Sequence, residues 1–168
     1  CGIATLTKEY VEKADPVQIL DTRKTTPGLR SFEKYAVSCG GGKNHRFGLY
    51  DAVLIKDNHI KASGGIMQAV NKVKERHNSS IQIEVETTTL AEVREAIEAK
   101  SDIIMLDNMS IENIKKAVNI IDGRACIEVS GSISIDQLNM LSQINIDYIS
   151  IGALTHSSKA SDISMNFL

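Results

Sequence analysis

A cluster of basic side chains in the first third of the sequence could bind a small anion. Between Asp21 and Lys61 there are eight Lys or Arg residues against four Asp or Glu, although the whole chain of 168 residues carries a net charge of −2. Arginine pairs with carboxylates and phosphates through two parallel hydrogen bonds, and lysine supplies a compact charge. The predicted anion ligands are Arg23, Lys24, His45, Arg46 and Lys56. From the charge count alone, a solvated positive face is an equally open alternative.

Acidic side chains at two places could bind a metal ion or sugar hydroxyls. Glu84 and Glu86 are two residues apart, so they share one face of a strand while Ile83 and Val85 take the other. Asp107 directly follows another apolar segment. Two alternatives stay open: Glu84 forms a structural ion pair, and Asp107 caps the next helix.

Two short segments with glycine could bind phosphate. They are Ser130-Gly131-Ser132 and Ser150-Ile151-Gly152-Ala153. Successive backbone N–H groups in such turns form anion-binding concavities. Each signal is weak alone, but together they follow the last two apolar segments, where α/β barrels commonly bind phosphate. His77 and His156 lack a comparable context, and we interpret both as structural.

Short apolar segments recur along the chain and predict the strands that would position these residues. Several are continuous hydrophobic runs, as expected for parallel strands buried on both faces. The six segments are Val17–Leu20, Ala52–Ile55, Ile81–Val85, Ile103–Leu106, Cys126–Val129 and Tyr148–Ile151.

The intervening segments have helical patterns. Thr89 with Glu92, and Ser134 with Gln137, match the capping box that begins a helix. Apolar residues at helical spacing mark three helical faces: Leu90, Val93 and Ile97; Ile111, Ile114, Val118 and Ile121; Ile66, Val70 and Val73. We also expect a helix to begin at Thr26-Pro27 and to end at Gly40-Gly41-Gly42. Strands alternating with helices predict an α/β fold, either a barrel or a doubly wound sheet.

Each predicted strand is followed at once by polar residues or glycine. The carboxyl ends of parallel strands converge on one edge of the sheet, so these residues are predicted to form one site. A lysine at a strand end, such as Lys56, has a second interpretation as a Schiff-base nucleophile of an aldolase.

Composition excludes several other classes of protein. No apolar run approaches the ~18 residues of a membrane span, and no secretory leader is visible. The net charge argues against nucleic acid as the main partner. Three widely spaced cysteines indicate neither a disulfide framework nor a zinc site, so we expect a reducing, cytoplasmic location. The chain begins at Cys1, from which we expect truncation or processing.

The ordered motifs resemble the quinolinate phosphoribosyltransferase family, the decarboxylating enzymes of NAD synthesis. The resemblance extends from about Gly2 to about Ser157. The matching motifs are Asp21–Arg30, Lys34–Val37 with Gly40–Arg46, Leu54–His59, Glu84-Val85-Glu86, Ile104–Asn108 and Gly152–His156. The resemblance implies an incompletely closed TIM-like α/β barrel of six or so parallel strands, with residues 1–168 forming the catalytic domain. It also implies a homodimer and an N-terminal domain, outside this sequence, that supplies an arginine to the neighbouring subunit's site.

The resemblance further implies a reaction and a role for each site residue. Quinolinate would react with 5-phosphoribosyl-1-pyrophosphate and Mg²⁺ to give nicotinate mononucleotide, CO₂ and pyrophosphate. Arg23, His45, Arg46 and Lys56 would hold the two carboxylates of quinolinate, and Lys24 and Lys56 would reach the pyrophosphate. Glu86 and Asp107 would orient the ribose and its magnesium. Thr22 would also bind substrate, and the two glycine segments would hold the 5′-phosphate.

One motif departs from the family pattern, and three alternatives to the function remain. Ser132 stands where the family often has glycine, so it must avoid a positive φ or accept strain. The alternatives are a nicotinate-using relative, an aldolase built on Lys56, and a non-catalytic anion-binding module.

Overall fold

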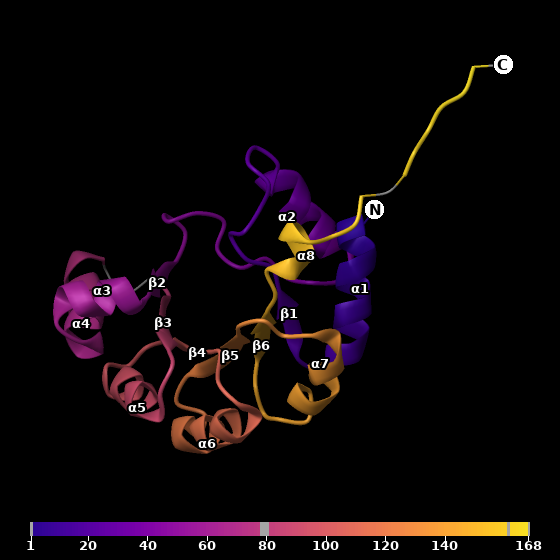
Figure 1. The fold of residues 1–168 in the computed structure, drawn as a ribbon. Coiled ribbons are helices and arrows are strands. Elements are labelled where there is room, and N and C mark those ends of the chain that lie inside the picture. The colour runs from indigo at the N-terminus through magenta and orange to yellow at the C-terminus, as the bar shows by residue number, and fades with distance from the viewer. Residues whose placement is uncertain (1, 78–80, 161, 168) are drawn as a thin grey trace.

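A single curved parallel sheet with helices outside it forms the fold (Figure 1). The computed structural model describes residues 2–77, 81–160 and 162–167. The strands are β1 (Gln18–Leu20), β2 (Val53–Ile55), β3 (Ile83–Thr87), β4 (Ile103–Asp107), β5 (Cys126–Ser130) and β6 (Tyr148–Ser150). All six predicted strands are confirmed, with ends that differ by one or two residues.

Eight helices are present in the described part of the chain. They are α1 (Gly2–Ala14), α2 (Arg30–Cys39), α3 (Asp57–Ser63), α4 (Ile66–Arg76), α5 (Leu90–Glu98), α6 (Ile111–Ile121), α7 (Ile135–Leu141) and α8 (Ala153–His156). In Figure 1 the helices α4, α5, α6, α7 and α1 follow the outer side of the row of strands. None of these helices is long and apolar enough to cross a membrane.

The sheet is an open barrel. The strand order is β1-β6-β5-β4-β3-β2, and every neighbouring pair is parallel. β1 and β2 lie at the two ends of this order, so the barrel has a seam between them. Lys43 forms a bridge with Leu20 at the end of β1, and the chain then continues to Val53 in β2. The incompletely closed barrel is therefore confirmed.

Alternation along the strands separates the core from the barrel interior. Val85, Ile104 and Val129 are buried against the outer helices, where Val93 of α5 and Ile114 of α6 pack in the same cluster. The intervening strand positions share the opposite face. Register places Glu86 opposite Met105, and Met105 opposite Glu128, in one row across β3, β4 and β5. The interior of the barrel is therefore polar, which prepares it for a binding site rather than for packing alone.

Sequence signals for helix ends are mostly confirmed. Both capping boxes form, at Thr89 and Ser134, and Gly40 is the C-cap of α2. The predicted start at Thr26-Pro27 is wrong, because α2 begins at Arg30. Gly28 has a φ of +79°, and the Leu29 N–H donates to the Thr26 carbonyl at 3.0 Å, so this segment is a turn. The helices α1, α3 and α8 were not predicted.

A buried ion pair joins the end of β1 to α2 and to the segment after α2. Lys34 Nζ lies 2.5 Å from Asp21 Oδ1, and both side chains are almost fully buried. The His45 N–H donates to the same carboxylate at 2.9 Å, and Lys34 Nζ donates to the His45 carbonyl at 2.9 Å. Burial raises the pKa of Asp21 in spite of these donors. Both backbone groups of His45 are therefore fixed by one pair of charges.

Replacing Lys34 with Met is expected to destabilise the fold strongly. The Asp21 carboxylate would remain buried without its cation, which typically costs about 3–5 kcal/mol of unfolding free energy. Urea denaturation followed by circular dichroism measures the loss. Lys8→Met is the matched control, because the Lys8–Glu12 pair spans 3.7 Å on an exposed helix face and should be nearly neutral. Equal stability of the two variants would show that the buried pair does not anchor this region.

Candidate active site

A cavity of about 790 Å³ opens at the carboxyl ends of the strands. All fourteen residues predicted as ligands line it: Thr22, Arg23, Lys24, His45, Arg46, Lys56, Glu86, Asp107, Ser130, Gly131, Ser132, Ser150, Gly152 and Ala153. They come from the ends of all six strands and from the segment that crosses the seam. The structure therefore brings the predicted residues to one place.

Two arginines form the cationic wall near the seam. Arg46 Nη1 donates to the Ala52 carbonyl at 3.3 Å, which holds its side chain along this segment. Burial, followed by the charge of Arg23, lowers the pKa of Arg46. Arg23 Nε is buried and has no hydrogen-bond partner in the described part of the chain. Two guanidinium groups close together on one wall offer several N–H donors to an anion such as a carboxylate or a phosphate.

Lys56 and Glu86 form an ion pair at the other side of the cavity. Lys56 Nζ lies 2.5 Å from Glu86 Oε2, and the Lys56 side chain is 46% exposed. A Schiff-base lysine is usually activated by desolvation in an apolar pocket or by a neighbouring cation. Lys56 has a carboxylate partner and remains accessible, so its surroundings favour binding of an anion over covalent catalysis.

Asp107 lies at the end of β4, beside the Lys56–Glu86 pair in the sheet order. Asn108 Nδ2 donates to Asp107 Oδ2 at 2.9 Å, and the Asn108 backbone has a φ of +52°. Asparagine tolerates this left-handed conformation better than most residues. Asn108 therefore holds the Asp107 carboxylate in place. Asp107 does not cap α6: Ser110 does, with its side chain accepting from the Asn113 N–H.

The first glycine segment depends on a residue without a side chain. Gly131 has a φ of +99°, and a Cβ there would collide with the side chain of Asn108 and approach its backbone nitrogen at 2.8 Å. Ser132 follows with a φ of +31°, so the departure from the family's glycine is accompanied by backbone strain. In the second segment, a Cβ at Gly152 would lie 3.1 Å from Lys24 and 3.2 Å from His156. Because glycine has no side chain at these two positions, the backbone of both segments remains accessible from the cavity.

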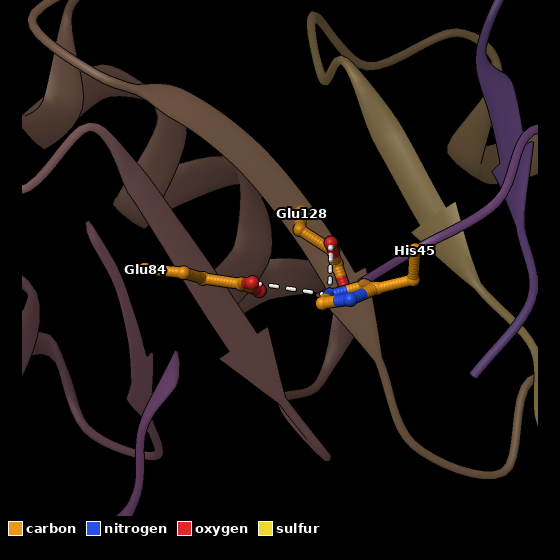
Figure 2. A group of neighbouring side chains, drawn as sticks. All are labelled: His45, Glu84 and Glu128. Carbon is orange, nitrogen blue, oxygen red and sulfur yellow. Dashed lines mark ion pairs between the residues drawn. The ribbon is translucent and has the colours of Figure 1, made fainter. Parts of the chain in front are cut away.

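A cluster of one histidine and two glutamates lies in the barrel interior (Figure 2). His45 Nε2 is 3.0 Å from Glu84 Oε2 and 3.5 Å from Glu128 Oε2. Burial alone would lower the pKa of His45, but hydrogen bonds to Glu128 and Glu84, and their charges, raise it to about 10. Burial raises the pKa of Glu84. Glu84 therefore has a structural partner inside the protein, the ring of His45.

Several cavity residues were not predicted from the sequence. Glu128 precedes the glycine segment by two residues and therefore shares the inward face of β5 with Ser130, a period that could have identified it. His156, interpreted from the sequence as structural, lies on the cavity wall one turn after Gly152. Asn108, Leu54, Met105, Ile133 and Ile151 complete the lining.

Gly131→Ala is expected to weaken phosphate binding by about tenfold or more. The new Cβ must displace Asn108 and distort a segment that lines the cavity. Loss of one hydrogen bond to a charged phosphate corresponds to this loss in affinity. Gly123→Ala is the matched control, because Gly123 also has a positive φ, of +70°, but a Cβ there would have no atom within 4 Å. Calorimetric titration with inorganic phosphate measures both. If Gly123→Ala weakens binding equally, the loss reflects backbone strain in general rather than the cavity.

Comparison with known proteins identifies what this chain is similar to. Residues 3–166 match the family described as quinolinate phosphoribosyl transferase, C-terminal domain. The chain is 48% identical, over 98% of its length, to quinolinate phosphoribosyltransferase [decarboxylating] 2a, mitochondrial, of Nicotiana tabacum, and covers 52% of that protein. It is 47% identical to a probable nicotinate-nucleotide pyrophosphorylase [carboxylating] of Bacillus subtilis, with 98% of this chain and 58% of the relative covered.

A solved structure agrees with both relatives. NadC from Streptococcus pyogenes superimposes with a TM-score of 0.93 at 49% identity, over 99% of this chain and 59% of that one. The chain thus spans little more than half the length of the relatives it matches.

Proposed function

Because this chain belongs to the family of quinolinate phosphoribosyltransferase C-terminal domains, we propose that it carries the catalytic site of such an enzyme. The reaction joins quinolinate to 5-phosphoribosyl-1-pyrophosphate and releases pyrophosphate and CO₂, leaving nicotinate mononucleotide. The observation that carries the proposal is the single cavity that holds cations, strand-end acids and two glycine segments together.

The arrangement of charges supports a dicarboxylate as the acceptor. Arg23 and Arg46 on one wall and Lys56 on the other offer three cations to two carboxylates. A monocarboxylate such as nicotinate would leave part of this charge uncompensated, so quinolinate is favoured over nicotinate. His45 also lines the cavity, but both of its ring nitrogens contact protein atoms in this structure.

The rest of the cavity suits the phosphoribosyl donor. The segments after β5 and β6 would bind the 5′-phosphate through backbone N–H groups, together with Ser130, Ser132 and Ser150. Lys24 and Lys56 would approach the pyrophosphate, and Thr22 would add a hydroxyl at the end of β1. Glu86 and Asp107 would accept hydrogen bonds from the ribose hydroxyls.

Orientation and charge stabilisation are sufficient chemistry for this reaction. The ring nitrogen of quinolinate attacks the anomeric carbon while the bond to pyrophosphate breaks, which spreads positive charge on the ribose and negative charge on the leaving group. Loss of the adjacent carboxylate as CO₂ leaves an electron pair on the ring carbon, which takes a proton. A cationic cavity that holds both anions stabilises these charges, and no protein nucleophile is required.

The acidic residues also fit Mg²⁺, which we propose as the cofactor. Glu86 and Asp107 lie on adjacent strands, and their side-chain hydrogen bonds engage Oε2 of Glu86 and Oδ2 of Asp107. The second oxygen of each carboxylate can hold the waters or ribose hydroxyls around a substrate-bound Mg²⁺ ion. Bound Mg²⁺ would supply positive charge to the departing pyrophosphate.

The enzyme in its natural full length is proposed to be a cytoplasmic homodimer. Phe32, Tyr35, Leu49 and Tyr50 are each at least 70% exposed, on α2 and on the segment before β2, and this apolar surface supports contact with another part of the assembly. Cys39 and Cys126 are free thiols, which supports a reducing compartment. The tobacco relative is named mitochondrial, so the compartment differs among relatives.

Carbon dioxide release from carboxyl-labelled quinolinate tests the function directly. We expect release that requires 5-phosphoribosyl-1-pyrophosphate, together with formation of nicotinate mononucleotide detected by chromatography. The chain 1–168 alone is expected to turn over about 10²–10³ times more slowly than the full-length protein. It lacks the arginine that, by the family resemblance, an N-terminal domain supplies to the neighbouring site, and loss of one positioned cation has that effect on rate. Turnover of nicotinate but not quinolinate would contradict the proposed substrate.

Arg46→Ala should raise the KM for quinolinate by about tenfold or more, because a charge-assisted bidentate pair contributes about 1.5–3 kcal/mol. The KM for 5-phosphoribosyl-1-pyrophosphate should change much less. Steady-state kinetics with each substrate varied in turn measures both values. Lys115→Ala, on α6 and outside the cavity, is the charge-matched control. Equal increases in both KM values would assign Arg46 a general electrostatic role.

Removing Mg²⁺ with a chelator should abolish turnover, and added Mg²⁺ should restore it. Asp107→Asn should need more Mg²⁺ for half-maximal rate and lower the maximal rate by about 10²-fold. Asp136→Asn, exposed in the first turn of α7, is the control and should match the wild type. Full activity in the presence of excess chelator would exclude the proposed cofactor.

A further inference from the structure

Glu84 and Glu128 have no place among the proposed substrate ligands, although both are acidic side chains that are almost fully buried and Glu128 lines the cavity. Apart from the ion pair with His45, neither carboxylate oxygen of Glu128 has a hydrogen-bond partner in the described part of the chain. Burying two carboxylates costs desolvation free energy unless a partner such as a cation or a hydrogen-bond donor compensates for the lost water. Their shared neighbour is the ring of His45 (Figure 2).

The imidazole of His45 connects these carboxylates to Arg46. The Arg46 backbone N–H donates to His45 Nδ1 at 2.7 Å, while Nε2 faces Glu84 Oε2 at 3.0 Å. The two carboxylates raise the pKa of His45 and so favour a second ring proton, but that proton would occupy Nδ1, where the Arg46 N–H requires a lone pair. The contact with Arg46 therefore decides for a ring with one proton, on Nε2, which Glu84 accepts. The carboxylates and the Arg46 N–H thus favour the same tautomer.

The same three residues could instead hold a metal ion. One ligand atom from each of His45, Glu84 and Glu128 lies within 4.8 Å of the others. A metal-binding histidine, however, almost always donates its second ring N–H to an acceptor. Here the second nitrogen faces a donor, the Arg46 N–H, which favours a proton on Nε2 over a metal.

We propose that Glu84 and Glu128 are positioning residues that act through His45 to fix the backbone of Arg46 at the cavity wall. His45 is then held at four points: its N–H by Asp21, its carbonyl by Lys34, Nδ1 by Arg46 and Nε2 by the glutamates. Loss of the acceptors at Nε2 frees the ring, and the Arg46 guanidinium loses its fixed approach to the ligand. The part of this inference that concerns substrate rests on the proposed function.

The tautomer of His45 gives a test that does not depend on turnover. In the full-length protein labelled with ¹⁵N-histidine, long-range proton–nitrogen spectra should show one ring with a protonated Nε2 and an unprotonated Nδ1, and His45→Asn should remove that signal. A ring protonated at both nitrogens would overturn the proposal. So would a stoichiometric divalent transition metal that elemental analysis finds in the wild type and not in Glu128→Leu.

Kinetics of matched variants tests the consequence for binding. Glu84→Leu should raise the KM for quinolinate about tenfold, as expected for a lost hydrogen bond between charged groups, with little change in the KM for 5-phosphoribosyl-1-pyrophosphate. Glu84→Gln should restore most of the affinity, because the amide oxygen still accepts the Nε2 proton. Glu112→Leu, exposed at the start of α6, should change neither KM.

The two proposals fail in different ways. A wild-type protein that does not turn over quinolinate contradicts the proposed function and leaves the His45 spectrum as the test of the positioning role. An active enzyme in which Glu84→Leu folds and keeps the wild-type KM for quinolinate overturns the positioning role alone. If Glu84→Leu does not fold, Glu84→Gln and the wild-type spectrum still decide it.

Discussion

The arrangement of the cationic wall depends on the buried pair of Asp21 and Lys34. Asp21 ends β1 and Lys34 lies on α2, so their contact fixes the helix against the sheet. The same two side chains bind the N–H and the carbonyl of His45, which places the following Arg46. A charge pair of this kind contributes less net stability than well-packed apolar residues, but its geometry is specific. Here that specificity determines where a guanidinium faces the cavity.

Strand alternation provides the second constraint on the site. Residues that face outward from β3, β4 and β5 are mostly aliphatic and pack on the helices, while the inward-facing positions carry three glutamates as well as Met105. Glu84, Glu86 and Glu128 therefore occupy one interior surface at two depths. Glu86 and Glu128 lie in one row, in which Glu86 meets Lys56, and Glu84 lies one row deeper. Glu84 and Glu128 both approach the ring of His45. One face of a sheet thus carries both a ligand site and its support.

The sequence located the strands and the residues that line the cavity, but not the contacts between distant parts of the fold. Short segments rich in apolar residues, each followed by polar residues, located all six strands. Ile103–Leu106 is apolar throughout, whereas β3 and β5 alternate between residues that pack on the helices and glutamates inside the barrel. Capping boxes located α5 and α7 for a similarly local reason. The start of α2 was wrong because a positive φ at Gly28 favours a turn after Pro27. Glu128 was missed because its partner, His45, lies far earlier in the chain, and only the strand register and the buried Asp21–Lys34 pair bring them together.

Because of the seam between β1 and β2, two parts of the cavity differ in how the strands beneath them are hydrogen-bonded. The glycine segments that we propose as the phosphate site follow β5 and β6, which are hydrogen-bonded to neighbours on both sides. The arginine wall instead spans two strands that share no ladder, connected by residues 43–52. Substitutions or small shifts in this connection can change the distance between Arg23 and Arg46 while the glycine segments keep their geometry. Under the proposed function, related proteins could therefore differ in the carboxylic acid they accept and still use the same phosphoribosyl donor.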